Sequence, residues 1–243
     1  WLAAFLGYLT HGLLDACTTY GTLLLWPFSA ARIVWNTIPV IAPLFTLPLL
    51  FGVVWGMTKQ SVLAPRLAFL WALVYPGLGA LQHDRAVIIG EGLAESRGHV
   101  GVSVSAKPTL GNLLLWKVIY RHEDQFWVDA VRVGTEVQVY SGGAVAAFNP
   151  ALHLTWLPDG AQQRKDLERF RWFSNDYLAV DVQDPLLIVD MRYSLLPNEI
   201  KGLWGIKFDP NAGANAHVSY EVQRSVDSDR AKRLWAMLSG KPQ

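Results

Sequence analysis

Apolar residues are concentrated at the start of this chain, and the pattern divides the sequence into two parts. Residues 1–80 hold four charged side chains, whereas residues 81–243 carry 18 of the 21 lysines and arginines and 19 of the 20 aspartates and glutamates. So few charges are typical of membrane-embedded helices, and the remainder has the composition of a soluble domain. Residues 1 to about 18 predict the end of an apolar helix. Because the chain begins inside that helix with Trp1, we expect upstream residues to be missing.

Two further segments of the apolar part predict membrane spans. Residues 37–57 are 21 uncharged residues, long enough to cross a bilayer, although three prolines would kink the segment or make part of it re-entrant. Residues 66–81 are a second, shorter candidate. If both cross, residues 11–21 and everything after residue 81 lie on the same side of the membrane. We therefore expect a membrane-embedded helical region over residues 1–81.

Beyond residue 81 the sequence predicts a juxtamembrane helix or linker over residues 82–106 and a β-rich soluble domain over residues 107–243. Runs of β-branched and aromatic residues predict strands. These runs are 113–120, 126–133, 136–140, 177–182, 186–193, 203–208 and 218–222, and Ser141-Gly142-Gly143 is expected to end the first set. Helices are predicted over residues 162–172 and 227–238, the latter with Asp227 or Ser228 as N-cap. The fold class predicted is α+β, with a mostly antiparallel sheet.

Candidate chemistry lies near the start of the chain, where His11 and Asp15 interrupt an apolar helix. Residues four apart lie on one face of a helix, so the imidazole and the carboxylate can bind one metal ion together. The spacing is also compatible with two simpler roles, because the pair can hydrogen-bond to each other or cap the helix end. A charge in an apolar helix is costly without a partner, so some partner is expected in each case.

The surrounding residues extend this motif into a longer pattern. Residues 7–21 read Gly-Tyr-Leu-Thr-His-Gly-Leu-Leu-Asp-Ala-Cys-Thr-Thr-Tyr-Gly, and Leu-Leu-Trp-Pro-Phe-Ser follows at 24–29. Together with Pro-Leu-Phe-Thr-Leu-Pro-Leu-Leu at 43–50, these runs resemble the YdjM-like family of bacterial inner-membrane proteins, described as predicted metal-dependent hydrolases. Residues 107–243 resemble the tail of longer members more loosely. The resemblance implies an integral protein of the inner (plasma) membrane.

The resemblance also implies roles for individual residues. The family is similar in motif to zinc-dependent phospholipase C and P1 nuclease, in which a His-x-x-x-Asp helix supplies metal ligands. His11 and Asp15 are therefore the implied ligands of a divalent ion, zinc or manganese. Thr18, Thr19 and Tyr20 are candidates to orient these ligands or bind substrate, and capping of the helix end is the equally weighted alternative. Gly21 is expected to take a positive φ.

The chain departs from the family pattern in two ways. The family carries further His and Asp motifs upstream of this helix, and none is present. The family often has aspartate before the Pro-Leu-Phe-Thr run, where this chain has Ala42. Two hypotheses stay open: a membrane-bound metal-dependent hydrolase, of phosphoesters or lipid-linked substrates, and a degenerate, non-enzymatic membrane scaffold with a β-rich binding or assembly domain.

Composition adds little about partners. The net charge is +1 and basic residues do not cluster, so we expect no nucleic-acid partner and take membrane lipid as the expected one. The single cysteine, Cys17, excludes an intrachain disulfide and is expected to be a small buried residue.

Overall fold

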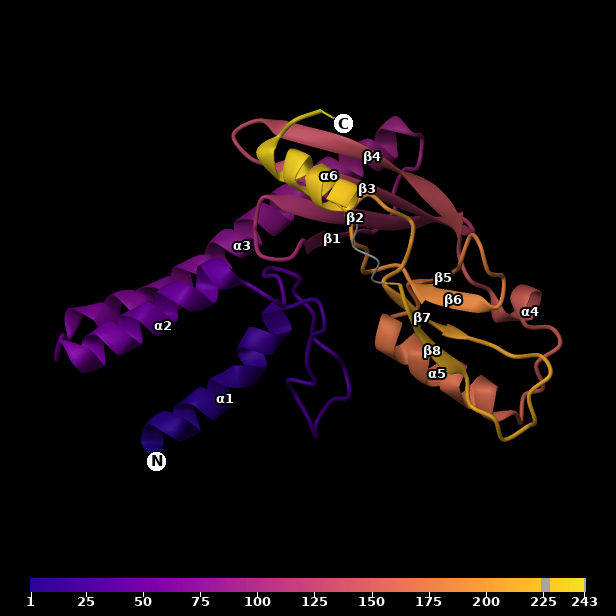
Figure 1. The fold of residues 1–243 in the computed structure, drawn as a ribbon, viewed down its shortest axis with the longest axis horizontal. Helices are drawn as coiled ribbons and strands as arrows, with labels where there is room; N and C mark the ends of the chain where they lie inside the picture. The colour runs from indigo at the N-terminus through magenta and orange to yellow at the C-terminus, as the bar shows by residue number, and fades with distance from the viewer. Residues whose placement is uncertain (224–227, 243) are drawn as a thin grey trace. The chain divides into compact units, whose positions relative to one another are not determined.

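The computed structural model describes residues 1–223 and 228–242 and confirms the α+β prediction, with helices first and two antiparallel four-stranded sheets after them (Figure 1). By its internal contacts the chain divides into two compact units. Unit 1 comprises Trp1–Ile89, Ala106–Trp116 and Arg132–Val137, and unit 2 comprises Gly90–Ser105, Lys117–Val131 and Gln138–Gln243.

Three apolar helices dominate unit 1: α1 (Leu2–Cys17), α2 (Pro43–Thr58) and the start of α3 (Leu63–Ser96). α2 and α3 lie side by side as a hairpin (Figure 1). A Cβ added at Gly52 of α2 would lie 2.6 Å from the Cβ of Ala68, so the glycine permits close approach of the two helices. The Trp71 indole N–H donates to the Leu44 carbonyl at 3.0 Å across the same contact. Small residues thus hold the hairpin together.

The helix boundaries correct two expectations. α2 begins at Pro43, and the six residues before it, 37–42, are not helical, because proline is favoured at the first position of a helix and disfavours the helical conformation in the residue before it. Residues 66–81 and the helix expected after them are one continuous helix, α3, that reaches Ser96. The first polar residues after Leu81 end the apolar stretch without ending the helix, because no helix-terminating signal accompanies them.

The first sheet has the strand order β1-β2-β3-β4, with β1 (Val104–Pro108), β2 (Leu115–His122), β3 (Gln125–Val133) and β4 (Val137–Ala146). The expectation that Ser141-Gly142-Gly143 ends this set was wrong, because β4 continues through it. A Cβ at Gly142 would lie 2.2 Å from the Val128 carbonyl oxygen. The glycine therefore serves close strand packing rather than a turn. The sequence also missed β1.

The second sheet lies within unit 2 and has the order β5-β6-β7-β8, all antiparallel: β5 (Leu178–Val180), β6 (Leu187–Asp190), β7 (Trp204–Lys207) and β8 (Ser219–Val222). At its inner strand β6 both faces are buried. Ile188 packs in a core with Leu167 and Phe170 of α5 (Gln162–Ser174), which covers one face (Figure 1). Leu187 and Val189 point the other way, into a core with residues of β2 and β3. Successive side chains of a strand point to opposite faces of the sheet, which is why these neighbours of β6 lie in two different cores.

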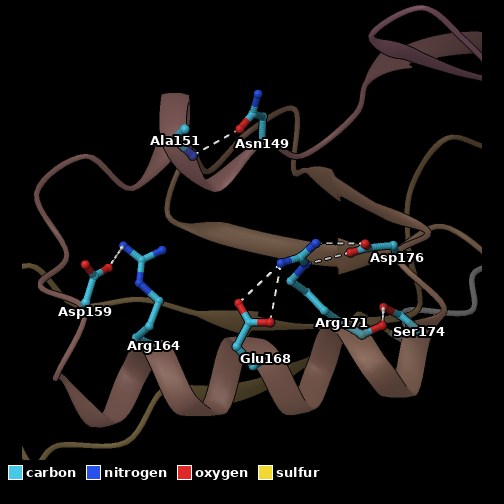
Figure 2. A network of polar contacts seen from close by, with 8 residues as sticks. All are labelled: Asn149, Ala151, Asp159, Arg164, Glu168, Arg171, Ser174 and Asp176. Carbon is cyan, nitrogen blue, oxygen red and sulfur yellow. Dashed lines mark hydrogen bonds and ion pairs between the residues drawn. The ribbon is translucent and has the colours of Figure 1, made fainter.

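Ion pairs and caps stabilise α5 from its surface (Figure 2). The Arg171 guanidinium donates to both Asp176 carboxylate oxygens, at 2.8 and 2.9 Å, and contacts Glu168 at 3.3 Å. Asn175 ends the helix in the left-handed region, with φ of 52°. In the short helix α4 (Pro150–His153), Asn149 is the N-cap and accepts from the Ala151 N–H at 3.0 Å. These contacts stabilise the carboxyl end of α5 and the start of α4.

The terminal helix α6 (Ser228–Ser239) contacts β4, where the Tyr140 hydroxyl donates to the Met237 carbonyl at 3.1 Å. The expected N-cap Asp227 lies outside the described residues, and Ser228 is the first residue of the helix. The other predicted helices and strands are present, with ends shifted by a few residues.

Candidate functional site

The predicted metal-binding pair lies on one exposed face of α1. His11 Nε2 is 3.3 Å from the nearer Asp15 carboxylate oxygen, and the two side chains are 67% and 45% exposed. The i,i+4 spacing alone brings them together, because one helical turn places the fourth residue on the same face. The pair therefore forms as expected and is open to a ligand from outside the helix.

The geometry of the pair fits a shared cation. Two ligand atoms bound to one zinc ion at tetrahedral angles lie roughly 3.3–3.6 Å apart, from bond lengths of about 2.0–2.2 Å. The observed separation of 3.3 Å falls in this range, so both atoms can face one ion with little rearrangement. The same separation also suits a direct ion pair between a protonated imidazole and the carboxylate, so the distance alone does not choose between them.

The end of α1 is anchored in a way that accounts for the residues after Asp15. The Thr18 hydroxyl donates to the Asp15 main-chain carbonyl at 2.8 Å, so Thr18 caps the helix. Gly21 has φ of +68°, as expected, and a Cβ there would lie 2.4 Å from the Ile33 carbonyl oxygen. The capping alternative thus describes the Thr18 hydroxyl in this structure, while roles for Thr19 and Tyr20 stay predictions.

Residues 35–38 complete the anchor. The N–H groups of Trp35 and Thr37 donate to the carbonyls of Ala16 and Cys17 at 2.7 and 2.8 Å. These carbonyls would otherwise lack partners, because the last turn of a helix has no N–H groups of its own to offer them. α1 is therefore held at its carboxyl end, next to Asp15, by the segment that leads into α2.

Metal-binding groups elsewhere are sparse. Among residues 1–223 and 228–242, no three His, Cys, Asp or Glu side chains gather as a metal site. Two other His–Asp pairs occur in the described part of the chain: His83 Nδ1 lies 3.2 Å from Asp84, and His217 Nδ1 lies 2.8 Å from Asp166 of α5. They offer matched controls for the pair on α1, because each combines one imidazole with one carboxylate.

The structure also reveals a buried polar cluster that the sequence analysis missed. Asp129 of β3 is buried and accepts from both terminal nitrogens of Arg97, at 2.6 and 2.9 Å. The same guanidinium donates to the Tyr120 hydroxyl at 3.1 Å, and His99 Nδ1 lies 3.1 Å from that hydroxyl. The carboxylate raises the pKa of Arg97 above its ordinary value. This pair joins the carboxyl end of α3 to β3 and has a structural role.

A second missed group is Lys117 of β2, which is 4% exposed. Its Nζ donates to the Ser194 hydroxyl oxygen at 2.8 Å and to the Glu199 carbonyl at 3.0 Å. Burial lowers the pKa of Lys117 to about 7, against an opposing effect of the Asp190 and Glu199 carboxylates. The sequence held one signal, a lysine inside the apolar run Leu-Leu-Leu-Trp-Lys-Val-Ile-Tyr at 113–120.

Comparison with known proteins finds a similar family for the first part of the chain. A family model described as YdjM inner membrane protein matches residues 1–86. Residues 1–86 are therefore similar to this family. The match includes α1 with His11 and Asp15, α2 and the first two thirds of α3. The chain matches none of the curated proteins and none of the solved structures with which it was compared.

One feature of residues 1–86 in the structure agrees with the expected membrane location. Within the described chain, α3 is the one helix long and apolar enough to cross a bilayer, whereas α1 and α2 are apolar but shorter. Large apolar side chains cover the outer surface of the α2–α3 hairpin, among them Leu50, Phe51, Leu70 and Leu73. An exposed apolar surface of this kind marks a site of contact with lipid or with another protein.

Proposed function

We propose that this protein is a membrane-bound, metal-dependent hydrolase in which His11 and Asp15 supply two ligands of a divalent cation, zinc or manganese. The observation that carries the proposal is the exposed pair on α1, with 3.3 Å between His11 Nε2 and the Asp15 carboxylate. The match of residues 1–86 to the family of YdjM inner membrane proteins supports a membrane location. Phosphoesters or lipid-linked compounds at the membrane surface are the proposed substrates.

His11 and Asp15 would each supply one ligand atom of a different kind. His11 would offer a neutral imidazole nitrogen and Asp15 a carboxylate oxygen, both held on the last turns of α1 by the capped helix end. A bound divalent cation would supply Lewis acidity, which polarises a phosphoryl or carbonyl group and acidifies a water molecule. A hydrolytic site uses about three protein ligands, and the pair supplies two. A further ligand is therefore part of the proposal.

The position of Ala42 bears on the alternative of an inactive scaffold. Ala42 is the N-cap of α2 and packs with Ile38, Phe45 and Tyr75. Aspartate is among the preferred N-cap residues, because its carboxylate accepts from the free N–H groups of the first turn. An aspartate at this position would cap α2, so its absence here does not by itself argue against metal binding.

The test is the metal content of the protein purified in detergent, with any residues that precede Trp1 included. Elemental analysis of the wild type is compared with His11→Ala/Asp15→Ala and with the matched control His83→Ala/Asp84→Ala. We expect near-stoichiometric zinc or manganese in the wild type and in the control, and its loss in the first variant. A wild type without bound metal, or equal metal in all three proteins, refutes the proposal and leaves the scaffold hypothesis.

A further inference from the structure

A serine hydroxyl and a desolvated lysine amine meet in unit 2. Lys117 lies in the middle of β2 and is itself buried, so its amine has little access to bulk water. Ser194 is half-buried, in the loop that follows β6. The 2.8 Å between Nζ and Oγ is a hydrogen-bond distance, and it joins residues 77 positions apart in the sequence. One partner is thus buried and the other is half-buried.

The surroundings hold this pair in place. Nζ also donates to the Glu199 carbonyl at 3.0 Å, which fixes the amine on the same loop that carries Ser194. The loop is anchored further on, where Arg230 lies 3.4 Å from the Glu199 carboxylate and the Asn198 side chain donates to the Ser141 carbonyl at 3.0 Å. Anchored side chains of this kind are a requirement of a catalytic group, because reacting atoms must be held in one geometry.

The protonation state of Lys117 suits the acceptance of a proton. A lysine with an ordinary pKa is charged at neutral pH and has no lone pair to offer, whereas burial lowers the pKa of Lys117 to about 7. The charged groups that act on it are the carboxylates of Asp190 and Glu199, and they only partly offset the burial. A substantial fraction of neutral amine is therefore present near pH 7, where it can act as a general base.

We propose that Ser194 and Lys117 form a nucleophile–base pair that cleaves carboxylic esters. The Ser194 hydroxyl now donates to the Leu196 carbonyl at 2.7 Å, and it must turn toward Nζ for this step. Ser194 Oγ then bonds to the ester carbonyl carbon while its proton passes to Lys117 Nζ. The alcohol leaves with that proton. Water hydrolyses the acyl-serine, giving a proton to Nζ, which returns it to Ser194 Oγ.

The same loop suggests the charge of the ester. A pocket of about 340 Å³ is lined by Asn198, Glu199 and Lys201 of the loop and by Arg230 and Arg233 of α6. Three cationic side chains against one carboxylate give the pocket a net positive charge. Neither Ser194 nor Lys117 lines this pocket, which is formed in part by later residues of the same loop. Esters that carry a negative group away from the reacting carbonyl are therefore the proposed substrates, because the pocket would attract that anionic part.

The experiment is labelling of the detergent-purified protein with a fluorophosphonate probe, which bonds covalently to activated serines. We expect labelling of the wild type and of Ser239→Ala, an exposed-serine control, and none of Ser194→Ala. Lys117→Arg keeps a charged donor but cannot accept the proton, so labelling is expected to fall by about 10²-fold or more. In the wild type the labelling rate should rise as pH increases from 6 to 8. Absence of labelling in folded wild type, or labelling unchanged in Ser194→Ala, overturns the proposal.

Two further readouts complete the test. Labelling should be unaffected by EDTA and by His11→Ala/Asp15→Ala, so its outcome is independent of the metal site proposed above. Hydrolysis of p-nitrophenyl hemisuccinate should exceed that of p-nitrophenyl acetate, and Lys201→Ala/Arg233→Ala should abolish the difference. If the double variant leaves the ratio of the two rates unchanged, the assignment of anionic esters is wrong.

Discussion

The low pKa of Lys117 leads to a prediction about stability that does not depend on any catalytic role. In the unfolded chain the lysine has its ordinary pKa of 10.5, and in the folded protein its pKa is about 7. Between these values the unfolded state binds more protons than the folded state, so the free energy of unfolding rises with pH. The destabilisation by Lys117 is complete below pH 7 and is relieved as pH increases toward 10.5.

The magnitude follows from the same two values. One unit of pKa difference corresponds to about 1.36 kcal/mol, so the full interval is worth about 5 kcal/mol, and the change between pH 7.5 and 9.5 is about 2–3 kcal/mol. Lys117→Met keeps a similar volume and removes the titrating amine, although it leaves the Glu199 carbonyl without that donor. The free energy of unfolding of the wild type, minus that of Lys117→Met, should therefore increase by about 2–3 kcal/mol from pH 7.5 to pH 9.5.

The assay is urea unfolding in detergent at pH 7.5, 8.5 and 9.5, followed by tryptophan fluorescence and circular dichroism. Other groups that titrate in this range are common to both proteins and cancel in the difference. Lys232→Met removes an exposed lysine of α6 and is the control for the loss of a lysine as such. A Lys117→Met difference that changes with pH no more than the Lys232→Met difference would refute the prediction, because it would mean that Lys117 titrates alike in the folded and unfolded states.

Two further predictions concern the helices of unit 1. A Cβ at Gly79 of α3 would lie 2.2 Å from the Thr37 carbonyl oxygen, whereas a Cβ at Gly77 would meet nothing within 4 Å. Gly79→Ala should therefore lower the thermal midpoint in detergent, and Gly77→Ala should raise it, because alanine has a helix propensity about 1 kcal/mol more favourable than glycine. Equal effects of the two substitutions would contradict the close contact at Gly79. The N-cap Ala42 makes no side-chain cap hydrogen bond, so Ala42→Ser should raise the free energy of unfolding by about 0.5–1 kcal/mol in the same assay, and a loss of stability would show that apolar packing outweighs capping.

Local patterns carried most of the fold prediction. The strand runs and the helix at residues 162–172 were recognised because burial on one or both faces imposes a period of 2 or 3.6 on the sequence. The errors arose where a contact from elsewhere overrode the local signal. Gly142 has the composition of a turn, yet it lies inside β4 because Val128 approaches too closely for any side chain. The sequence predicted helix on both sides of Leu81 but not that α3 runs through this change in polarity without a break.

The candidate sites divide in the same way. The contact between His11 and Asp15 follows from the sequence alone, since four residues make one helical turn whatever the rest of the chain does. Lys117 meets Ser194 across 77 residues, and Arg97 meets Asp129 across 32, so only the pairing of strands and the packing of loops bring these groups together. Burial is likewise a property of the assembled protein: the sequence shows a lysine in an apolar run, but the low pKa exists only because folding removes water from around its amine.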